Sequence, residues 1–251
     1  NVFGVPIGTM IGDAIGWRFT FLFIIIVSVI AGVLMMVYLP STSELNQVQR
    51  QWGSTSNKQL NTSKILRPAE VVKYLTITFL ILVANSVTFV YINPLILNHG
   101  HQMGFVSLAL LVNGIAGVIG TSLGGILADK LSSKRWLIIA FSIFIVMMLI
   151  MNLILHTVTL LLIGLFIWNI VQWSTNPAIQ SGMIEHVEGD TSQVMSWNMS
   201  SLNAGIGFGG IIGGLVVSNI SVQAVTIVSA MVGAMGLIIV LSLKNMSYMR
   251  N

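Results

Sequence analysis

The chain has 251 residues, of which 55% are hydrophobic and only 7% are charged. Ordinary soluble domains carry about 25% charged residues, so this composition predicts a membrane protein and argues against a soluble domain. The chain has no cysteine, which excludes disulfide frameworks and thiolate metal sites, and its formal net charge is +4.

Apolar stretches of about twenty residues recur along the chain, and each is long enough to cross about 30 Å of hydrocarbon as a helix. The predicted spans are 18–39, 74–97, 104–128, 136–155, 158–182, 196–218 and 222–243. A shorter apolar piece at residues 2–12 has no basic segment before it. We interpret it as the end of a helix whose beginning is missing, and we therefore expect the sequence to be a fragment.

The first residues carry glycine at every fourth position, namely Gly4, Gly8, Gly12 and Gly16, with Pro6 among them. Each glycine costs a helix about 1 kcal/mol relative to alanine. Residues four apart lie on one stripe of a helix, and a glycine stripe lets a second helix approach closely. The row therefore predicts a tight helix seam, either as plain packing or as part of a gate.

The polar segment 40–73 is rich in Ser, Asn and Gln. It predicts a linker between two membrane blocks, with a short amphipathic helix on the membrane surface over 66–72. Residues 1–39 then end the first block, residues 74–243 form a six-helix block, and residues 244–251 form a tail. If the two blocks are equal halves, the complete protein has twelve spans.

Lysine and arginine lie in alternate connections. They occur in the linker, in the turn before residue 136 and in the tail, whereas the connections around 98–104, 156–157 and 218–221 have none. By the positive-inside rule the basic connections and the C-terminus are cytoplasmic. Orientation in a membrane thus explains the positive charge, and we expect no nucleic-acid partner.

The residue composition of the spans follows a pattern in which every third span is almost purely apolar. Those at 18–39 and 136–155 are almost purely apolar and the span at 222–243 comes close, whereas the spans between them carry Gly, Asn, Gln and Trp. A helix that is apolar all round faces lipid, while small and polar residues mark packing faces or cavity walls. Every third helix is therefore expected at the periphery.

The glycine row carries a resemblance to a known family. Together with Pro6 and the following Trp17, Arg18 and Phe21, it resembles motif C, the fifth-helix signature of drug–proton antiporters in the major facilitator superfamily. The ending in Trp17 and Arg18 is most similar to the bacterial efflux branch.

The stretch GILADKLSSKR resembles motif A of the same superfamily, which lies between helices eight and nine. The matching residues are Gly125, Asp129, Lys130, Lys134 and Arg135. Ser132 stands where that family usually has a second glycine. The resemblance implies an all-α integral membrane protein with the major facilitator fold, here the end of helix five through helix twelve of a twelve-helix transporter.

The resemblance also implies gating roles. In the family the motif C stripe meets helix eight of the other half and closes the external side, and Gly120 and Gly124, with Ala116, offer a matching stripe here. By the same analogy Asp129 makes charged hydrogen bonds across the interface between the halves, and its basic neighbours orient it. Ordinary helix packing and a solvated loop are the alternative readings.

Neutral polar residues are the candidates for a substrate site. The predicted substrate-binding residues are Asn85, Tyr91, Asn169, Gln172, Trp173, Asn176 and Gln180. Those of the span 158–182 recur at steps of three or four and share a helix face. Hydrogen bonds between helices are the alternative role, because polar groups in a bilayer need partners. The pair Asn93 and Pro94 predicts a break near the external end of the span 74–97.

No charged side chain is expected inside the spans, apart from the boundary residues Asp13 and Arg18. Intramembrane charges mark proton relays, so a proton carrier is expected in the missing N-terminal helices. We expect no cofactor and no metal, with a proton gradient as the energy source. His99 and His101, and the acidic stretch 185–190, are expected to be solvated loops. No motif of an enzyme occurs.

The first functional hypothesis is proton-coupled efflux of small amphipathic compounds or drugs by alternating access. An exporter of sugars, nucleosides or other metabolites is the alternative within the superfamily, and a receptor or sensor that transports nothing is the alternative outside it. The expected partners are a small-molecule substrate and the lipid bilayer, and the expected protein is a monomer in the bacterial inner membrane.

Overall fold

The structure, a computed structural model, describes residues 8, 11–12, 15–38 and 64–244. They belong to two units, which are taken separately here. The first contains helix α2, Trp17–Tyr38. This helix is apolar along its length, and within its own unit its side chains from Phe21 to Ala31 are exposed. A helix of this kind matches the lipid-facing helix predicted for 18–39.

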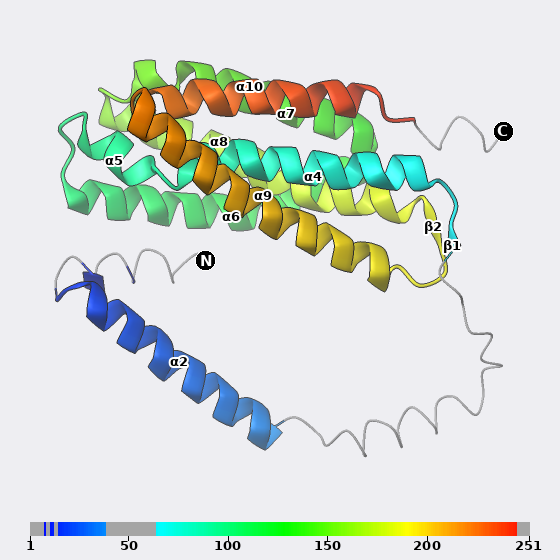
Figure 1. The fold of residues 1–251 in the computed structure, drawn as a ribbon, viewed down its shortest axis with the longest axis horizontal. Helices are drawn as coiled ribbons and strands as arrows, with labels where there is room; N and C mark the ends of the chain where they lie inside the picture. Colours follow the sequence, from blue (N-terminus) through cyan, green and yellow to red (C-terminus); the bar gives the residue numbers. More distant parts are fainter. Residues whose placement is uncertain (1–7, 9–10, 13–14, 39–63, 245–251) are drawn as a thin grey trace. The chain divides into compact units, whose positions relative to one another are not determined.

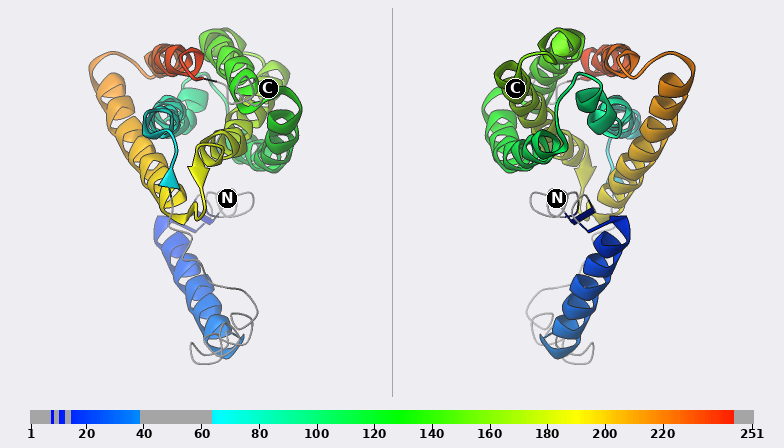
Figure 2. Two further views of the ribbon diagram at one scale, coloured as in Figure 1. Left: turned by 90° about the vertical axis from the view of Figure 1, so that its right-hand side faces the viewer. Right: turned by 90° about the vertical axis from the view of Figure 1, so that its left-hand side faces the viewer.

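The second unit is a helical bundle (Figure 1). Its helices are α4 (Pro68–Phe89), α5 (Ile92–Leu97), α6 (Met103–Leu131), α7 (Ser133–Ile154), α8 (Val158–Ile184), α9 (Ser192–Asn219) and α10 (Ala224–Leu241). Helix α8 packs against α6 and α7, and α4 packs against α9, α10 and α8. The end-on views in Figure 2 show α4 and α8 between α9 on one side and α6 and α7 on the other. Within the described residues seven helices are long and apolar enough to cross a membrane, which confirms the seven predicted spans.

Helix α4 begins earlier than predicted. It starts at Pro68, where residues 68–73 had been predicted as the end of the linker and part of a surface helix. Proline suits the first position of a helix, because its missing N–H would have no partner there. Glu70 and Lys73 therefore lie in the first turns of α4, at the end of this span, and not in the linker as predicted.

The predicted span 74–97 is broken into α4 and α5. The break lies at Val90 and Tyr91, three residues before the predicted position at Pro94. A proline ring clashes with the carbonyl of the residue four positions earlier, which here is Val90. The amide of Tyr91 bonds to Thr88 O at 3.1 Å, so the last turn of α4 tightens before the chain restarts as α5.

A short antiparallel pairing joins the start of α4 to the connection between α8 and α9. Strand β1 (Lys64–Ile65) pairs with β2 (Val187–Glu188), and Leu66 N donates to His186 O at 2.9 Å. Nothing in the sequence pattern predicted these two-residue strands. They fix the direction from which the chain enters the bundle.

Polar side chains join α7 and α10, the two almost purely apolar helices of the bundle, to their neighbours. Asn152 of α7 donates to Thr226 Oγ1 of α10 at 3.0 Å, and Thr88 of α4 shares a 2.7 Å hydrogen bond with Ser229 of α10. Thr226 and Ser229 are fully buried. In hydrocarbon such bonds satisfy groups that have no water to bind, so they help to hold α10 on its neighbours.

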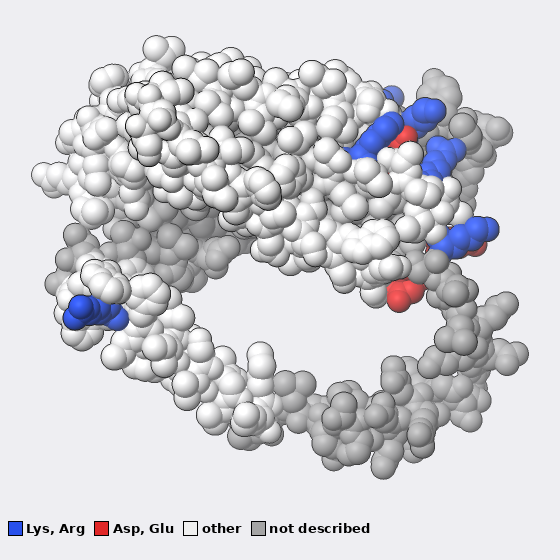
Figure 3. Space-filling model, viewed as in Figure 1, with Lys and Arg blue, Asp and Glu red and all other residues white. Residues whose placement is uncertain are grey.

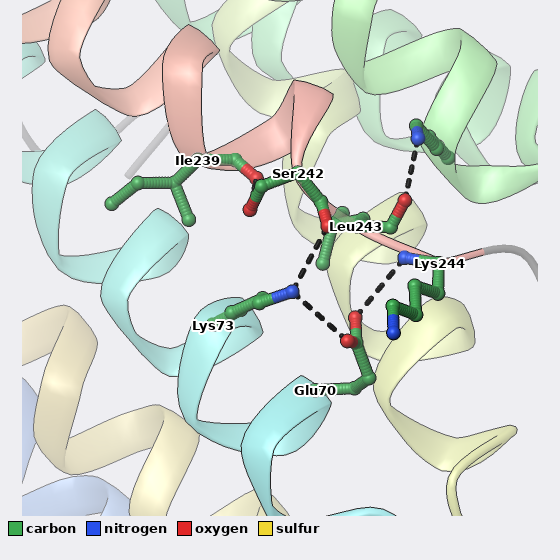
Figure 4. A network of polar contacts seen from close by, with 7 residues as sticks. Glu70, Lys73, Ile239, Ser242, Leu243 and Lys244 are labelled. Atoms are coloured by element: carbon green, nitrogen blue, oxygen red, sulfur yellow. Dashed lines mark hydrogen bonds and ion pairs between the residues drawn. The ribbon is translucent and has the colours of Figure 1, made fainter.

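Charged side chains of residues 64–244 gather at the end of the bundle where α4 begins and α10 ends (Figure 3). Figure 4 shows the network at this end. Lys73 Nζ lies 2.9 Å from Glu70 Oε1 and donates to Ser242 O at 2.9 Å, while Lys244 N donates to Glu70 Oε2 at 3.2 Å. The last carbonyls of a helix lack partners within the helix, so Lys73 satisfies one of them. The network ties the end of α10 to the first turn of α4.

Candidate functional site

The closest helix seam of the bundle lies between α6 and α8. A Cβ atom at Gly120 would lie 2.9 Å from Ile170 Cα, and one at Gly124 would lie 2.7 Å from Ser174 Cα. The two glycines thus pack on the backbone of α8, and their predicted contact with the row at the start of the chain stays a prediction. The small stripe does mark close helix packing, as its spacing predicted.

A cavity of about 430 Å³ lies beside this seam. Its lining residues are Asn113, Gly114, Gly117, Val118, Thr121 and Ser122 of α6 and Trp173 of α8. The indole of Trp173 rests on Gly117, where a Cβ atom would come within 3.1 Å of Trp173 Nε1. Glycine at position 117 thus gives the ring its place in the wall. A mostly apolar wall with a few neutral hydrogen-bonding groups is typical of small-molecule sites.

Of the seven predicted substrate-binding residues, Trp173 lines this cavity. The side chain of Asn169 is buried and donates to Leu165 O at 2.8 Å, within its own helix. Gln180 Nε2 donates to Asn176 Oδ1 at 3.2 Å, and both side chains are half-buried. Of these residues of α8, Trp173 thus lines the large cavity, whereas Asn169, Asn176 and Gln180 form hydrogen bonds within their own helix.

Gln172 and the two predicted residues of the first helix after the linker lie elsewhere. Gln172 is buried, and its Oε1 has no hydrogen-bond partner in the described part of the chain, as is also true of Asn85 Oδ1. Tyr91 packs on α9, because its hydroxyl donates to Gly210 O at 3.2 Å and its ring lies 2.6 Å from a Cβ position at Gly213. This geometry favours a packing role for Tyr91 over substrate contact.

Sequence reasoning missed the polar residues that α6 gives to the cavity. Asn113, Thr121 and Ser122 all lie in its wall, but the span was read for its glycines alone. Asn113 and Thr121 lie two steps of four residues apart, with Gly117 between them, so they fall on one broad side of the helix and were a detectable pair. A search for neutral polar residues at this spacing would have found them.

The turn that resembles motif A consists of one residue. Helix α6 ends at Leu131 and α7 begins at Ser133, so Ser132 alone reverses the chain, with φ 77° and ψ 147°. This backbone conformation is nearly exclusive to glycine. Serine therefore holds here the conformation that suits the glycine it replaces, and the cost is of order 1–3 kcal/mol.

Ser132→Gly is expected to stabilise the protein because it removes this strain. A gain of about 1 kcal/mol corresponds to a rise in Tm of about 2–4 °C for a chain of this size, measurable by thermal unfolding in detergent. Ser133→Gly is the matched control, because position 133 is helical and glycine there costs about 1 kcal/mol. Equal shifts in the two variants would show that Ser132 carries no strain.

The charged residues of the same motif point to different partners. Lys134 Nζ donates to Leu243 O, so it joins α7 to the end of α10. The side chains of Asp129, Lys130 and Arg135 are exposed, and the carboxylate of Asp129 has no ion pair among the described residues. Its role as a latch stays a prediction. Gly125 has no atom within 4 Å of a Cβ position, so packing does not require glycine there.

The glycine row is described in part, since Gly4 and Pro6 lie outside the described residues. Cβ atoms at Gly8 and Gly12 would each lie 3.3 Å from the side chain of Thr20 in α2. Thr20 Oγ1 also donates to Gly8 O at 3.0 Å. Gly16 turns the chain into α2 with φ 107°. Within their own unit these glycines therefore serve the fold-back onto α2.

The acidic connection between α8 and α9 is held by its own hydrogen bonds. Asp190 Oδ1 accepts bonds from Ser192 Oγ and N, and these bonds lower the pKa of the Asp190 carboxyl. Burial raises the pKa of Glu185. The described residues contain no group of three or more His, Asp or Glu side chains that could hold a metal ion.

The two histidines that precede α6 join neighbouring connections. His101 Nε2 and Leu155 O form a 2.7 Å hydrogen bond, and the rings of His99 and His156 meet at 5.0 Å between centroids. These contacts hold the connection before α6 against the connection before α8. They give His99 and His101 a structural role.

Comparison with known proteins gives matches over most of the chain. The family model described as Major Facilitator Superfamily matches residues 1–190. An uncharacterized MFS-type transporter of Bacillus subtilis (strain 168), YbcL, is 31% identical over 240 residues, which are 95% of this chain and 58% of that protein.

Two further relatives cover the same region. Another uncharacterized MFS-type transporter of Bacillus subtilis (strain 168), YtbD, is 30% identical over 88% of this chain and 54% of its own length. A probable sugar efflux transporter of Helicobacter pylori (strain J99) is 27% identical over 94% of this chain and 58% of its own length. The chain thus spans little more than half the length of these relatives.

Proposed function

This chain belongs to the major facilitator superfamily, a family of multi-pass membrane transporters, and we propose that it exports a small neutral molecule by alternating access. The observation that carries the proposal is the cavity between α6 and α8, with Trp173 and neutral polar groups in its wall. Its volume, about 430 Å³, suits a molecule of metabolite or drug size. The lining residues of the cavity carry no charge, which favours an uncharged or weakly charged substrate.

Efflux as the direction is supported by two sequence similarities. The start of the chain resembles the motif C of exporters, and one of its relatives bears the name probable sugar efflux transporter. The protein is expected in the bacterial inner membrane as a monomer with a cytoplasmic C-terminus, driven by the proton gradient. The charged residues of the described spans lie at their ends, so the proton carrier is expected outside them.

Two substrate classes compete for the cavity. Amphipathic drugs suit the apolar part of the wall, which includes Val118 and the face of Trp173. A sugar suits the combination of an indole face with the amide of Asn113 and the hydroxyls of Thr121 and Ser122, because it offers both C–H groups and hydroxyls. The name of the Helicobacter pylori relative favours the sugar, and the resemblance to drug–proton antiporters favours the drug.

Reconstituted transport tests both classes. The full-length protein is placed in liposomes, and efflux of a labelled hexose and of a fluorescent amphipathic amine is followed with and without an imposed proton gradient. The expected result is saturable movement of one class, accelerated by the gradient and abolished by an uncoupler. Non-saturable leakage of both probes, equal to that of empty liposomes, would contradict transport.

A further inference from the structure

A second, much smaller cavity lies between α5, α6 and α8, next to the large one. Its volume is about 10 Å³. Most of its wall is apolar, but four polar side chains also line it, namely Asn93, Asn113, Trp168 and Asn169. Asn113 lines both cavities.

Three polar atoms at this small cavity are buried and lack a hydrogen-bond partner among the described residues. They are Asn93 Oδ1, Asn113 Oδ1 and Trp168 Nε1. Trp168 is fully buried, and its ring meets Phe89 edge to face at 6.4 Å. Buried polar groups in proteins are nearly always hydrogen-bonded, so three such atoms on residues that line one small cavity indicate a shared partner.

We propose that this cavity is a binding site for one ordered water molecule. The water donates one hydrogen bond to Asn93 Oδ1 and one to Asn113 Oδ1, and its oxygen accepts a hydrogen bond from Nε1–H of Trp168. These are three hydrogen bonds, the usual number for a buried water, and the volume is close to the roughly 10–15 Å³ that one water requires. Asn169 needs no share of it, since its amide nitrogen already bonds to Leu165 O.

The set of atoms also excludes an ion. A cation at this position would face the N–H of Trp168, and an anion would face two amide oxygens. A neutral molecule with two donors and an acceptor is the one small ligand that satisfies all three groups. The chemistry of the donors and acceptors therefore selects water.

The water has a consequence for the large cavity. Because it holds Asn113 Oδ1, it fixes the amide of Asn113 in the wall that faces the substrate. It also joins that wall to Asn93, which lies in α5 just beyond the break in the helix. Asn93 thus acts as a positioning residue, and this part of the inference rests on the proposed function, whereas the water site itself does not.

A double-mutant cycle in detergent tests the shared water through thermal stability. Trp168→Phe removes the donor and Asn93→Leu removes one acceptor, and each single change is expected to lower Tm by about 2–4 °C. The double variant should lose clearly less than the sum, since the first change already breaks the bridge. The control cycle combines Asn93→Leu with Trp136→Phe, whose Nε1 is also buried without a described partner but does not line this cavity. Additive losses in both cycles would overturn the proposal.

An experimental density map of the full-length protein tests the site directly, and it needs no variant that must fold. The expected peak lies within about 3.2 Å of Asn93 Oδ1, Asn113 Oδ1 and Trp168 Nε1. Direct bonds of these atoms to other protein groups, with no peak, would overturn the water site.

In the transport assay Asn93→Leu is expected to raise KM several-fold at an unchanged maximal rate. An unchanged KM would remove the link to substrate, while a protein that transports nothing but shows the peak would contradict only the proposed function.

Discussion

Gly124→Leu is expected to prevent the α6–α8 seam from forming, so that little folded protein is recovered. A side chain at this position would overlap the backbone of α8, since its Cβ atom alone would lie 2.7 Å from Ser174 Cα and 2.8 Å from Pro177 Cγ. Overpacking typically costs 1–3 kcal/mol even where side chains can move aside, and here part of the obstacle is backbone. Size-exclusion chromatography in detergent, followed by thermal unfolding, measures the yield and stability of the folded form.

The neighbouring glycine provides the matched control. Gly125 lies in the same helix, and no atom lies within 4 Å of a Cβ position there, so Gly125→Leu should fold with nearly unchanged Tm. Gly125→Ala should gain up to about 1 kcal/mol from helix propensity, whereas Gly124→Ala should lose stability despite the same propensity. If both leucine variants fold equally well, the close approach of α6 to α8 is not real.

Trp173→Ala is expected to raise the KM of transport at least tenfold while the protein still folds. The half-buried indole forms the α8 wall of the large cavity, and its loss removes the largest aromatic surface available to a substrate there. Burying the surface of a large apolar side chain contributes roughly 1.5–3 kcal/mol, and about 1.4 kcal/mol equals a factor of ten in affinity. Transport kinetics in liposomes give KM and maximal rate separately.

Two variants show whether the loss belongs to the cavity. Trp173→Phe keeps an aromatic face and should retain most of the affinity. Trp197→Ala removes an exposed tryptophan of α9 that does not line the cavity, so KM should not change. A KM increase of the same size in Trp197→Ala would mean that tryptophan loss acts through the membrane or through folding, and not through a substrate contact at Trp173.

The sequence predicted the number and the approximate limits of the described spans because length and apolarity are local properties. It also predicted a break near the end of the first span after the linker, since Pro94 cannot continue a helix. The exact position at Val90 follows from proline geometry, which places the clash four residues earlier. The start of α4 was missed because polar residues such as Glu70 and Lys73 hid the first turns of the helix.

Partners across the bundle were harder to predict than elements. The glycines Gly120 and Gly124 predicted a close approach of another helix, but a stripe of small residues does not indicate which helix that is. In the structure it is α8. The cavity needed knowledge of two helices at once, so Trp173 was predicted and Asn113 was not. The pairing of Lys64 with Glu188 joins distant positions through backbone atoms, which carry no sequence signal.

The network at the end of α10 sets a practical limit for engineering the C-terminus. Ser242 O, Leu243 O and Lys244 N, three consecutive residues after the helix, each take part in a hydrogen bond with α4 or α7. A fusion partner or affinity tag joined after Lys244 leaves all three bonds in place. A junction placed directly after Leu241, the last residue of α10, removes every one of them and leaves Lys73, Lys134 and Glu70 without these partners.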